Sequence, residues 1–171
     1  MGKRIDHFCW TAGRTACRLV AVLAFVVAVA LTGANGRADG VTASPSTDPD
    51  PCAVNSTVII HLQIRNEGEA SADINRVSVS NASNFSYVRG SSYYGETSLA
   101  DPRESEGTLT WEGARGEPLF SLRAGESVDF RFSLNTPGGA QTARLSYSIG
   151  YAEEGRSYNV EGTIQVTVEA T

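Results

Sequence analysis

The feature that most constrains the fold is a repeated alternation of apolar and polar residues between short turns. It is clearest from Gly107 to Leu134, where one alternating run ends at Trp111 and another extends from Val128 to Leu134. The turn Arg123-Ala124-Gly125-Glu126 precedes the last run. Because successive side chains of a strand point to opposite faces, each run predicts a strand with one buried face. That pattern favours antiparallel sheets over parallel ones, whose strands are apolar on both sides.

The same alternation recurs through most of the chain. Beyond the N-terminal segment, no window has the sustained apolar recurrence of an amphipathic helix. Turn residues come about every 8–12 positions, which predicts an all-β fold, an immunoglobulin-like antiparallel β-sandwich of about seven to eight strands. Asp101 to Gly107 is expected to be a charged loop. The residues expected to face the core outside the first stretch are Val58, Ile60, Leu62, Ile64, Val77, Val79, Phe85, Tyr87, Tyr93, Ala143, Leu145, Tyr147, Ile149, Tyr151, Ile164, Val166 and Val168.

The N-terminal segment is typical of a secretory signal. Four basic residues precede an unbroken apolar run from Leu19 to Leu31, and Gly36-Arg37-Ala38 fits a cleavage site. A membrane anchor needs about 20 apolar residues, a length the run approaches only if it continues to Gly36. We therefore expect residues 1–38 to be a signal peptide, or a signal or anchor helix that touches the membrane through residues 19–36. Both alternatives place the rest of the chain outside the cytoplasm, secreted or at the cell surface.

Composition divides the remainder in two. Residues 39–51 are rich in Pro, Asp, Ser and Thr and are expected to form a flexible spacer before the sandwich domain of residues 52–171. Residues 39–171 hold nine of the 14 basic residues and 18 of the 19 acidic ones, a net charge of −9. Such a surface repels phosphate backbones, so nucleic acid is not expected as a partner.

The cysteines do not provide a disulfide for the domain. Cys9 and Cys17 precede the apolar run, which leaves Cys52 alone after it. Cys52 is then either a bystander at the domain edge or a tether to another chain.

Four phrases occur in an order that resembles a known family. They are LQIRNEGEASADINRVSVS (62–80), FSYVRGSS (85–92), GTLTWEG (107–113) and LFSLRAGESVDFRFSL (119–134). Together they resemble the conserved repeat domain of bacterial and archaeal cell-surface proteins known as domain of unknown function eleven. The resemblance covers about 110 residues. It departs from the family at Asn81-Ala82-Ser83-Asn84, where members often carry an Asp-x-x-Pro step.

The resemblance implies a surface-exposed immunoglobulin-like module with a structural or adhesive role, and it implies no catalytic activity. The residues agree with that expectation. A hydrolase needs a nucleophile, a base and an orienting group, whereas the domain holds one histidine, His61, on the expected outward face of the first strand. We expect no catalytic residues and no cofactor.

Calcium is the cation that the acidic residues could bind, because its sites need several oxygen ligands from loops. Glu67, Glu69 and Asp73 surround the first turn and are the calcium candidates, although they do not reproduce a spaced acidic calcium loop.

Asn55, Asn81 and Asn84 each begin an N-glycosylation sequon and are candidate glycosylation sites if the chain is secreted. Of the aromatic residues that could form a sugar-stacking platform, the alternation places Tyr87 and Trp111 in the core. Tyr94 is left as the expected surface aromatic residue.

The sequence thus predicts a non-enzymatic, extracytoplasmic surface module with a structural or adhesive role. The alternative is a carbohydrate- or protein-ligand-binding domain of an envelope assembly, whose partner would be a surface protein or a glycan. A broad exposed aromatic patch would favour ligand binding. A long unpaired edge strand would favour assembly by strand addition.

Overall fold

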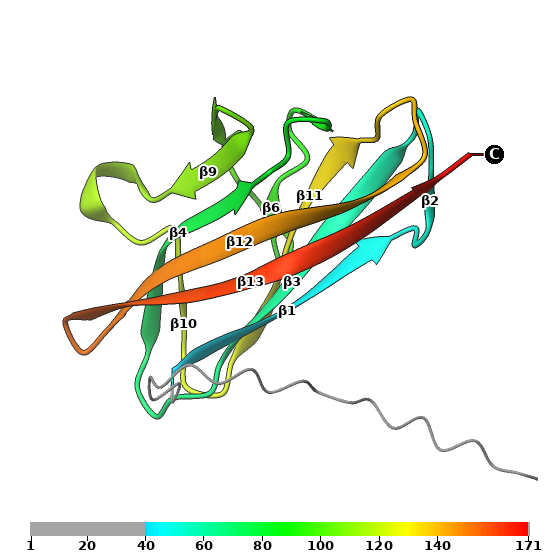
Figure 1. The fold of residues 1–171 in the computed structure, drawn as a ribbon. Helices are drawn as coiled ribbons and strands as arrows, with labels where there is room; N and C mark the ends of the chain where they lie inside the picture. Colours follow the sequence, from blue (N-terminus) through cyan, green and yellow to red (C-terminus); the bar gives the residue numbers. More distant parts are fainter. Residues whose placement is uncertain (1–39, 171) are drawn as a thin grey trace, which may run out of the picture. The chain divides into compact units, whose positions relative to one another are not determined.

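Two facing sheets bring the alternating runs together (Figure 1). The computed structural model describes residues 40–170. Sheet A has the order β1-β3-β11-β6-β7, and β5 also pairs with β11. Its strands are β1 (Val41–Asp48), β3 (Thr57–Asn66), β5 (Ser86–Tyr87), β6 (Tyr93–Tyr94), β7 (Thr97–Ser98) and β11 (Ser127–Asn135).

Sheet B faces sheet A and has the order β2-β13-β12-β4-β9-β8, with β10 also paired to β4. Its strands are β2 (Cys52–Ala53), β4 (Ala72–Ser80), β8 (Arg103–Ser105), β9 (Thr108–Glu112), β10 (Phe120–Leu122), β12 (Gln141–Glu153) and β13 (Arg156–Glu169). A single 3-10 turn, η1 (Ala114–Gly116), follows β9. Every strand pair is antiparallel except β2 and β13, which run parallel. The predicted all-β sandwich is therefore confirmed. The expected number of about seven to eight strands was wrong, because residues 40–170 form thirteen strands, several of them only two or three residues long.

The predicted alternation defines the core. On sheet A, four apolar residues of β3 stand directly opposite four of β11, with Val58 opposite Leu134 and Leu62 opposite Phe130. From sheet B, Trp111 reaches across the interior, its ring 5.1 Å from Phe130 and 4.9 Å from Phe132 between centroids. Aromatic pairs at such distances stabilise a core beyond the area they bury. Trp111 therefore links the two sheets.

Three expectations about element boundaries were wrong. The expected spacer contains β1, which pairs with β3 along all eight of its residues and buries Val41. The domain thus includes residues well before Cys52. Small and β-branched residues fit a sheet edge, and the ladder to β3 supplies the order that the composition does not indicate. The expected loop Asp101–Gly107 contains β8. The strand that holds Ile164, Val166 and Val168 is longer than these residues indicate and begins at Arg156.

The expected signal or anchor helix lies outside the described residues. Between Gly40 and Ala170, no helix is long and apolar enough to cross a membrane.

Asn66 joins two turns that are far apart in sequence. Its buried side chain donates from Nδ2 to the carbonyls of Ala70 (2.8 Å) and Leu122 (3.1 Å), and its Oδ1 accepts from the Gly68 N–H (3.0 Å). Its own carbonyl accepts from the Gly125 N–H at 2.9 Å. Gly125 has φ 75°, a left-handed conformation that favours glycine. The NEGEA and AGES phrases therefore meet in space.

We expect Asn66→Ala to lower the free energy of unfolding by about 2–3 kcal/mol, because it leaves buried carbonyl and amide groups without partners. The matched control is Asn75→Ala, since Asn75 is exposed on β4; its effect should stay within about 0.5 kcal/mol. Urea unfolding of both variants measures the difference. Equal effects would mean that Asn66 does not hold the two turns together.

Candidate functional site

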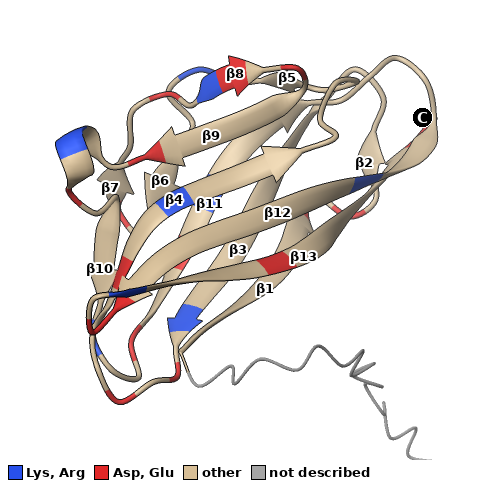
Figure 2. Ribbon diagram, turned by 60° about the vertical axis from the view of Figure 1, so that its left-hand side comes forward, with Lys and Arg blue, Asp and Glu red and all other residues tan. Residues whose placement is uncertain are grey.

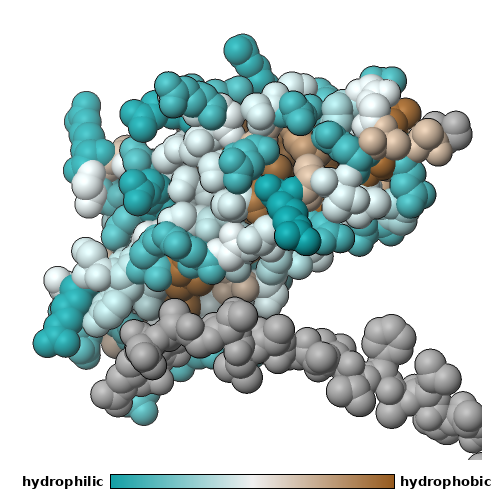
Figure 3. Space-filling model, in the orientation of Figure 1, coloured by the Kyte–Doolittle hydropathy of each residue, from teal (hydrophilic) through white to brown (hydrophobic). Residues whose placement is uncertain are grey.

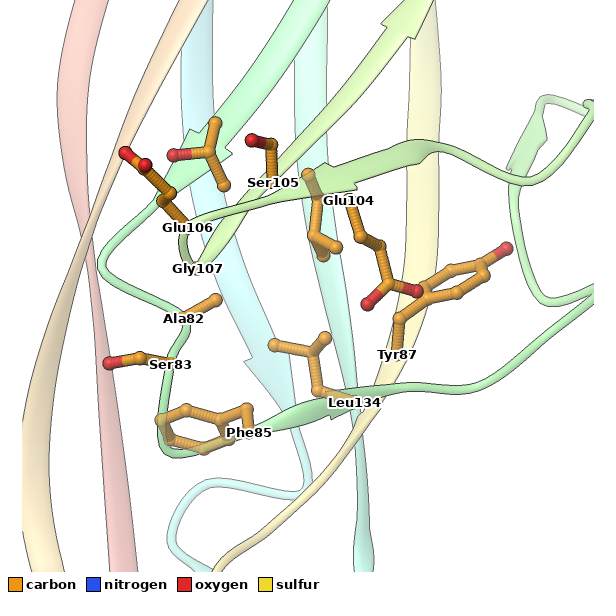
Figure 4. A pocket seen from close by; sticks show the side chains of 11 residues that line it. Ala82, Ser83, Phe85, Tyr87, Glu104, Ser105, Glu106, Gly107 and Leu134 are labelled. Carbon is orange, nitrogen blue, oxygen red and sulfur yellow. The ribbon is translucent and has the colours of Figure 1, made fainter.

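A hollow of about 320 Å³ opens between the edges of the two sheets, and we call it the β5–β8 hollow (Figure 4). The almost fully buried side chains of Leu109 and Leu134 form its floor, and its accessible lining is polar and apolar in similar measure. Phe85 and Tyr87 contribute aromatic rings. Carboxylate and hydroxyl groups stand at its rim. The lining residues are Ala82, Ser83, Phe85, Tyr87, Glu104, Ser105, Glu106, Gly107, Thr108, Leu109 and Leu134.

A tight hairpin between β8 and β9 forms one wall. Ser105 pairs with Thr108, so the connection has two residues, Glu106 (φ 49°) and Gly107 (φ 74°). Positive φ at both positions matches the twist of flanking strands in a two-residue hairpin. A Cβ on Gly107 would lie 3.1 Å from the Cβ of Ser83, and the Gly107 carbonyl accepts from the Ala82 N–H at 3.0 Å. Glycine thus lets the hairpin close onto the loop after β4.

A buried hydrogen-bond network holds the opposite side. The Oγ of Ser92 accepts from the Trp111 indole N–H at 2.9 Å and lies 2.8 Å from the Tyr87 hydroxyl. That hydroxyl donates to Asp101 Oδ1 at 2.8 Å, and the same oxygen accepts from the Gly90 N–H at 2.7 Å. The segment from β5 to β8 is thereby tied to the core through polar groups that would be costly to leave unpaired.

The network shifts two pKa values in opposite directions. Burial raises the pKa of the Tyr87 hydroxyl, so it remains a proton donor. The pKa of Asp101 is lowered, first by the hydrogen bond from the Gly90 N–H and then by the one from Tyr87. Asp101 is therefore held as a carboxylate that accepts hydrogen bonds from Tyr87 and Gly90.

The rim of the hollow carries negative charge. Figure 4 shows the side chain of Glu104 directed from β8 into the hollow, whereas the carboxylate of Glu106 points away from it. Within residues 40–170, neither carboxylate forms an ion pair. An unneutralised carboxylate beside an apolar floor suits a ligand with a cationic end and an apolar stem.

His61 lies on the outer face of sheet A, as predicted, in a cluster that the sequence does not reveal. Its Nδ1 is 2.9 Å from Asp129 Oδ2, and the Arg131 guanidinium is 3.7 Å from the same carboxylate oxygen. Arg131 also stands over the Tyr93 ring, 5.1 Å from its centroid. The strand register explains the cluster, because Arg131 is opposite both His61 and Tyr93.

A histidine–carboxylate pair can orient an imidazole as a base, but acyl transfer also needs a nucleophile on the other ring nitrogen. In the described part of the chain, no hydroxyl or thiol hydrogen-bonds to His61 Nε2. The cluster is an ionic and cation–π contact on a sheet surface.

The three calcium candidates make separate contacts. Glu67 is 3.9 Å from the Arg65 guanidinium, Asp73 accepts a 2.6 Å hydrogen bond from Ser121, and Glu69 is exposed on the turn. Among residues 40–170, no group of three or more acidic, histidine or cysteine residues is arranged to hold a metal ion.

The three sequon asparagines, Asn55, Asn81 and Asn84, are all exposed. Cys52, by contrast, is buried and its Sγ donates to the Thr167 carbonyl at 3.2 Å. Burial also raises the pKa of the Cys52 thiol. A tether to another chain therefore requires the β2 edge to open first.

The aromatic residues depart from expectation at two points. Tyr93, expected to face the core, lies on the outer face of sheet A beneath Arg131. Tyr87 and Trp111 are buried as predicted, but Tyr94 is partly buried and stacks on Phe120 with ring centroids 4.9 Å apart. The large hydrophobic residue most exposed in residues 40–170 is Tyr158, which is 40% exposed and stacks on Tyr151. Hydrophobic colour is confined to small separate areas on the face in Figure 3. One exposed ring does not make the broad aromatic patch expected of a sugar-stacking surface.

A second candidate surface is the open edge of sheet B. β13 is the longest strand, and on the side away from β12 only Val168 and Glu169 are paired, with β2. Its backbone from Arg156 to Thr167 pairs with no other strand in the described region. Figure 2 shows few charged residues along β12 and β13. Unpaired, weakly charged edges accept additional strands.

The other edges are protected. β1, at the edge of sheet A, contains Pro45, which has no N–H to offer. β7 and β8 have only two and three residues. β13 is thus the longest edge without strand pairing, and β1 lies close beside part of it.

Solved structures show what this arrangement is similar to. The cohesin module from a family 33 glycoside hydrolase of Clostridium perfringens superposes with a TM-score of 0.53 and 13% identity, over 77% of this chain and 97% of that one. Domains D2 and D3 of the major pilin SpaD from Corynebacterium diphtheriae superpose with a TM-score of 0.54 and 6% identity. That match covers 72% of this chain and 51% of the pilin fragment, so the chain spans about half of it.

No protein-family model matches the chain, and no curated protein matches it either. The resemblance to the surface repeat family therefore stays a prediction. At these identities the structural matches establish a shared sandwich fold.

Substitution Asp101→Asn tests the network that holds the hollow. Because the pKa of Asp101 is lowered in the folded state, its carboxylate stabilises the fold at pH values above the ordinary carboxyl pKa of 3.8. This stabilisation is lost as the pH falls through the lower pKa of the folded state. We expect wild type to be more stable than the variant at neutral pH, with a gap that closes below about pH 4. Urea unfolding from pH 7 to pH 2.5 measures it. A gap that stays constant over that range would contradict a role for the charge.

Proposed function

We propose that this chain is a non-enzymatic, extracytoplasmic surface module with a structural or adhesive role, built on an immunoglobulin-like sandwich. The observation that carries the proposal is the open edge of β13 on an otherwise packed sandwich. Main-chain groups along such an edge give affinity to an added strand, and the alternating side chains give specificity. A module with this edge joins its neighbours without a deep pocket.

Three further observations support the proposal. The N-terminal segment has the features of a secretion signal. The fold is similar to domains of a major pilin and to a cohesin module, and a module of either kind is consistent with a surface role. The negative charge of residues 39–171 favours solubility outside the cell.

The alternative function, a ligand-binding domain of an envelope assembly, is favoured by a different observation. The β5–β8 hollow combines an apolar floor with a carboxylate that has no partner in residues 40–170. The hollow lies near the β8 edge of sheet B, whereas β13 lies near the opposite edge of the same sheet. Assembly and ligand binding can therefore be tested separately.

Localisation is tested by fractionating cells that produce the full-length chain and sequencing the N-terminus of the recovered protein. We expect either a new terminus near Asp39 outside the cell or an intact terminus in the membrane fraction. An intact terminus in the soluble cytoplasmic fraction would contradict an extracytoplasmic role.

Assembly through β13 is tested with a photo-crosslinking residue at Thr163, on the β13 edge, in cells that produce the full-length chain. The control position is Thr142, exposed on the neighbouring strand β12. We expect discrete crosslinked products from position 163 and none from position 142. Gln165→Lys should reduce the products at least severalfold, because a charge on an edge strand opposes pairing. Equal products at both positions would contradict assembly at this edge.

A further inference from the structure

We propose that the β5–β8 hollow binds a lysine or arginine side chain presented by an extended segment of another protein. The inference rests on the ligand-binding form of the proposed function and does not depend on the β13 edge. It assigns a ligand chemistry to the hollow from the shape, polarity and charge of its lining.

The floor of the hollow selects an alkyl stem. Ala82, Leu109 and Leu134 line the hollow with hydrocarbon side chains, of which only a small part is exposed. The long basic side chains bury such stems along apolar surfaces while their charged ends stay hydrated. A short or purely polar side chain would leave the floor uncovered.

The rim selects positive charge. Glu104 enters the hollow from β8, and no basic residue between Gly40 and Ala170 forms an ion pair with it (Figure 4). The rings of Phe85 and Tyr87 line the same hollow. Aromatic faces attract a cation within about 6 Å, so rings in the lining favour a cationic ligand as the carboxylate does.

The bound cation is expected to come from another protein. The nine arginines and 18 acids of residues 39–171 leave an acidic surface that attracts basic segments and speeds their encounter. Charge complementarity therefore favours a basic partner segment over a second, equally acidic copy.

The test uses ¹⁵N-labelled full-length chain titrated with Nα-acetyl-lysine methylamide, followed by amide chemical shifts. A matched probe, Nα-acetyl-norleucine methylamide, has a similar alkyl stem and no charge. The matched protein variants are Glu104→Gln and Glu106→Gln, which remove the same charge two residues apart on one hairpin. Both sites are exposed, and the spectrum of each variant reports its fold directly.

We expect saturable shifts at Phe85, Gly107 and Leu109 with the lysine probe. Glu104→Gln should weaken binding about two- to fivefold, the range of an exposed ion pair, and Glu106→Gln should change it less than about 1.5-fold. The norleucine probe should bind at least about threefold more weakly, and added salt should weaken the lysine probe alone.

Equal binding of the two probes, or equal effects of the two variants, would overturn the proposal. Shifts scattered over the whole acidic surface would overturn it as well. Crosslinking at Thr163 that persists after such a result would leave assembly through β13 intact, so the two proposals fail separately.

Discussion

The position of Trp111 governs the rest of the structure. Its ring packs against Phe130 and Phe132 of the opposite sheet, and its indole N–H needs an acceptor in the interior. Ser92 supplies that acceptor and also contacts the Tyr87 hydroxyl. A core aromatic residue thereby fixes the irregular segment between β5 and β8. The same segment joins sheet A through β6 and β7, so both strand pairing and this network hold it beside the hollow.

The interior of the sandwich stabilises the fold, and the groups available for recognition lie at its edges and on its outer face. The inner faces of β3 and β11 are filled by apolar residues that stand opposite one another. What is left for recognition is the backbone of an open edge strand, a small hollow between sheet edges and a polar cluster around His61. Each of these depends on the register of strands distant in sequence. None requires a catalytic group.

The sequence predicts the core well because burial follows a period of two. Val58, Phe130 and Ile164 are buried as the alternation requires. Strand β1 is not predicted, because its residues are polar and its order comes from pairing with β3. The composition of β1 shows no alternating apolar face, so it does not predict an edge strand that is ordered by pairing with β3.

The candidate sites are less predictable than the core. The hollow joins Leu134 to Glu104 and Ala82, residues whose proximity depends on the β8–β9 hairpin. Asp129 and His61 are 68 residues apart and meet only through strand register. Tyr158 fits the alternation of buried residues but lies where its strand extends toward the β12–β13 hairpin, so it stays exposed. Local patterns contain no information about these distances.

The central claim is that a rigid core around Trp111 supports an edge strand whose backbone is free to pair. Amide hydrogen exchange on the purified full-length chain tests both halves of that claim in one measurement. We expect slow exchange in β11, which pairs with β3 along its whole length and with β5 and β6 at four residues on its other side. We expect fast exchange at alternate amides of β13 between Arg156 and Thr167. Uniformly slow exchange along β13 would show that its edge is covered, and would contradict the account.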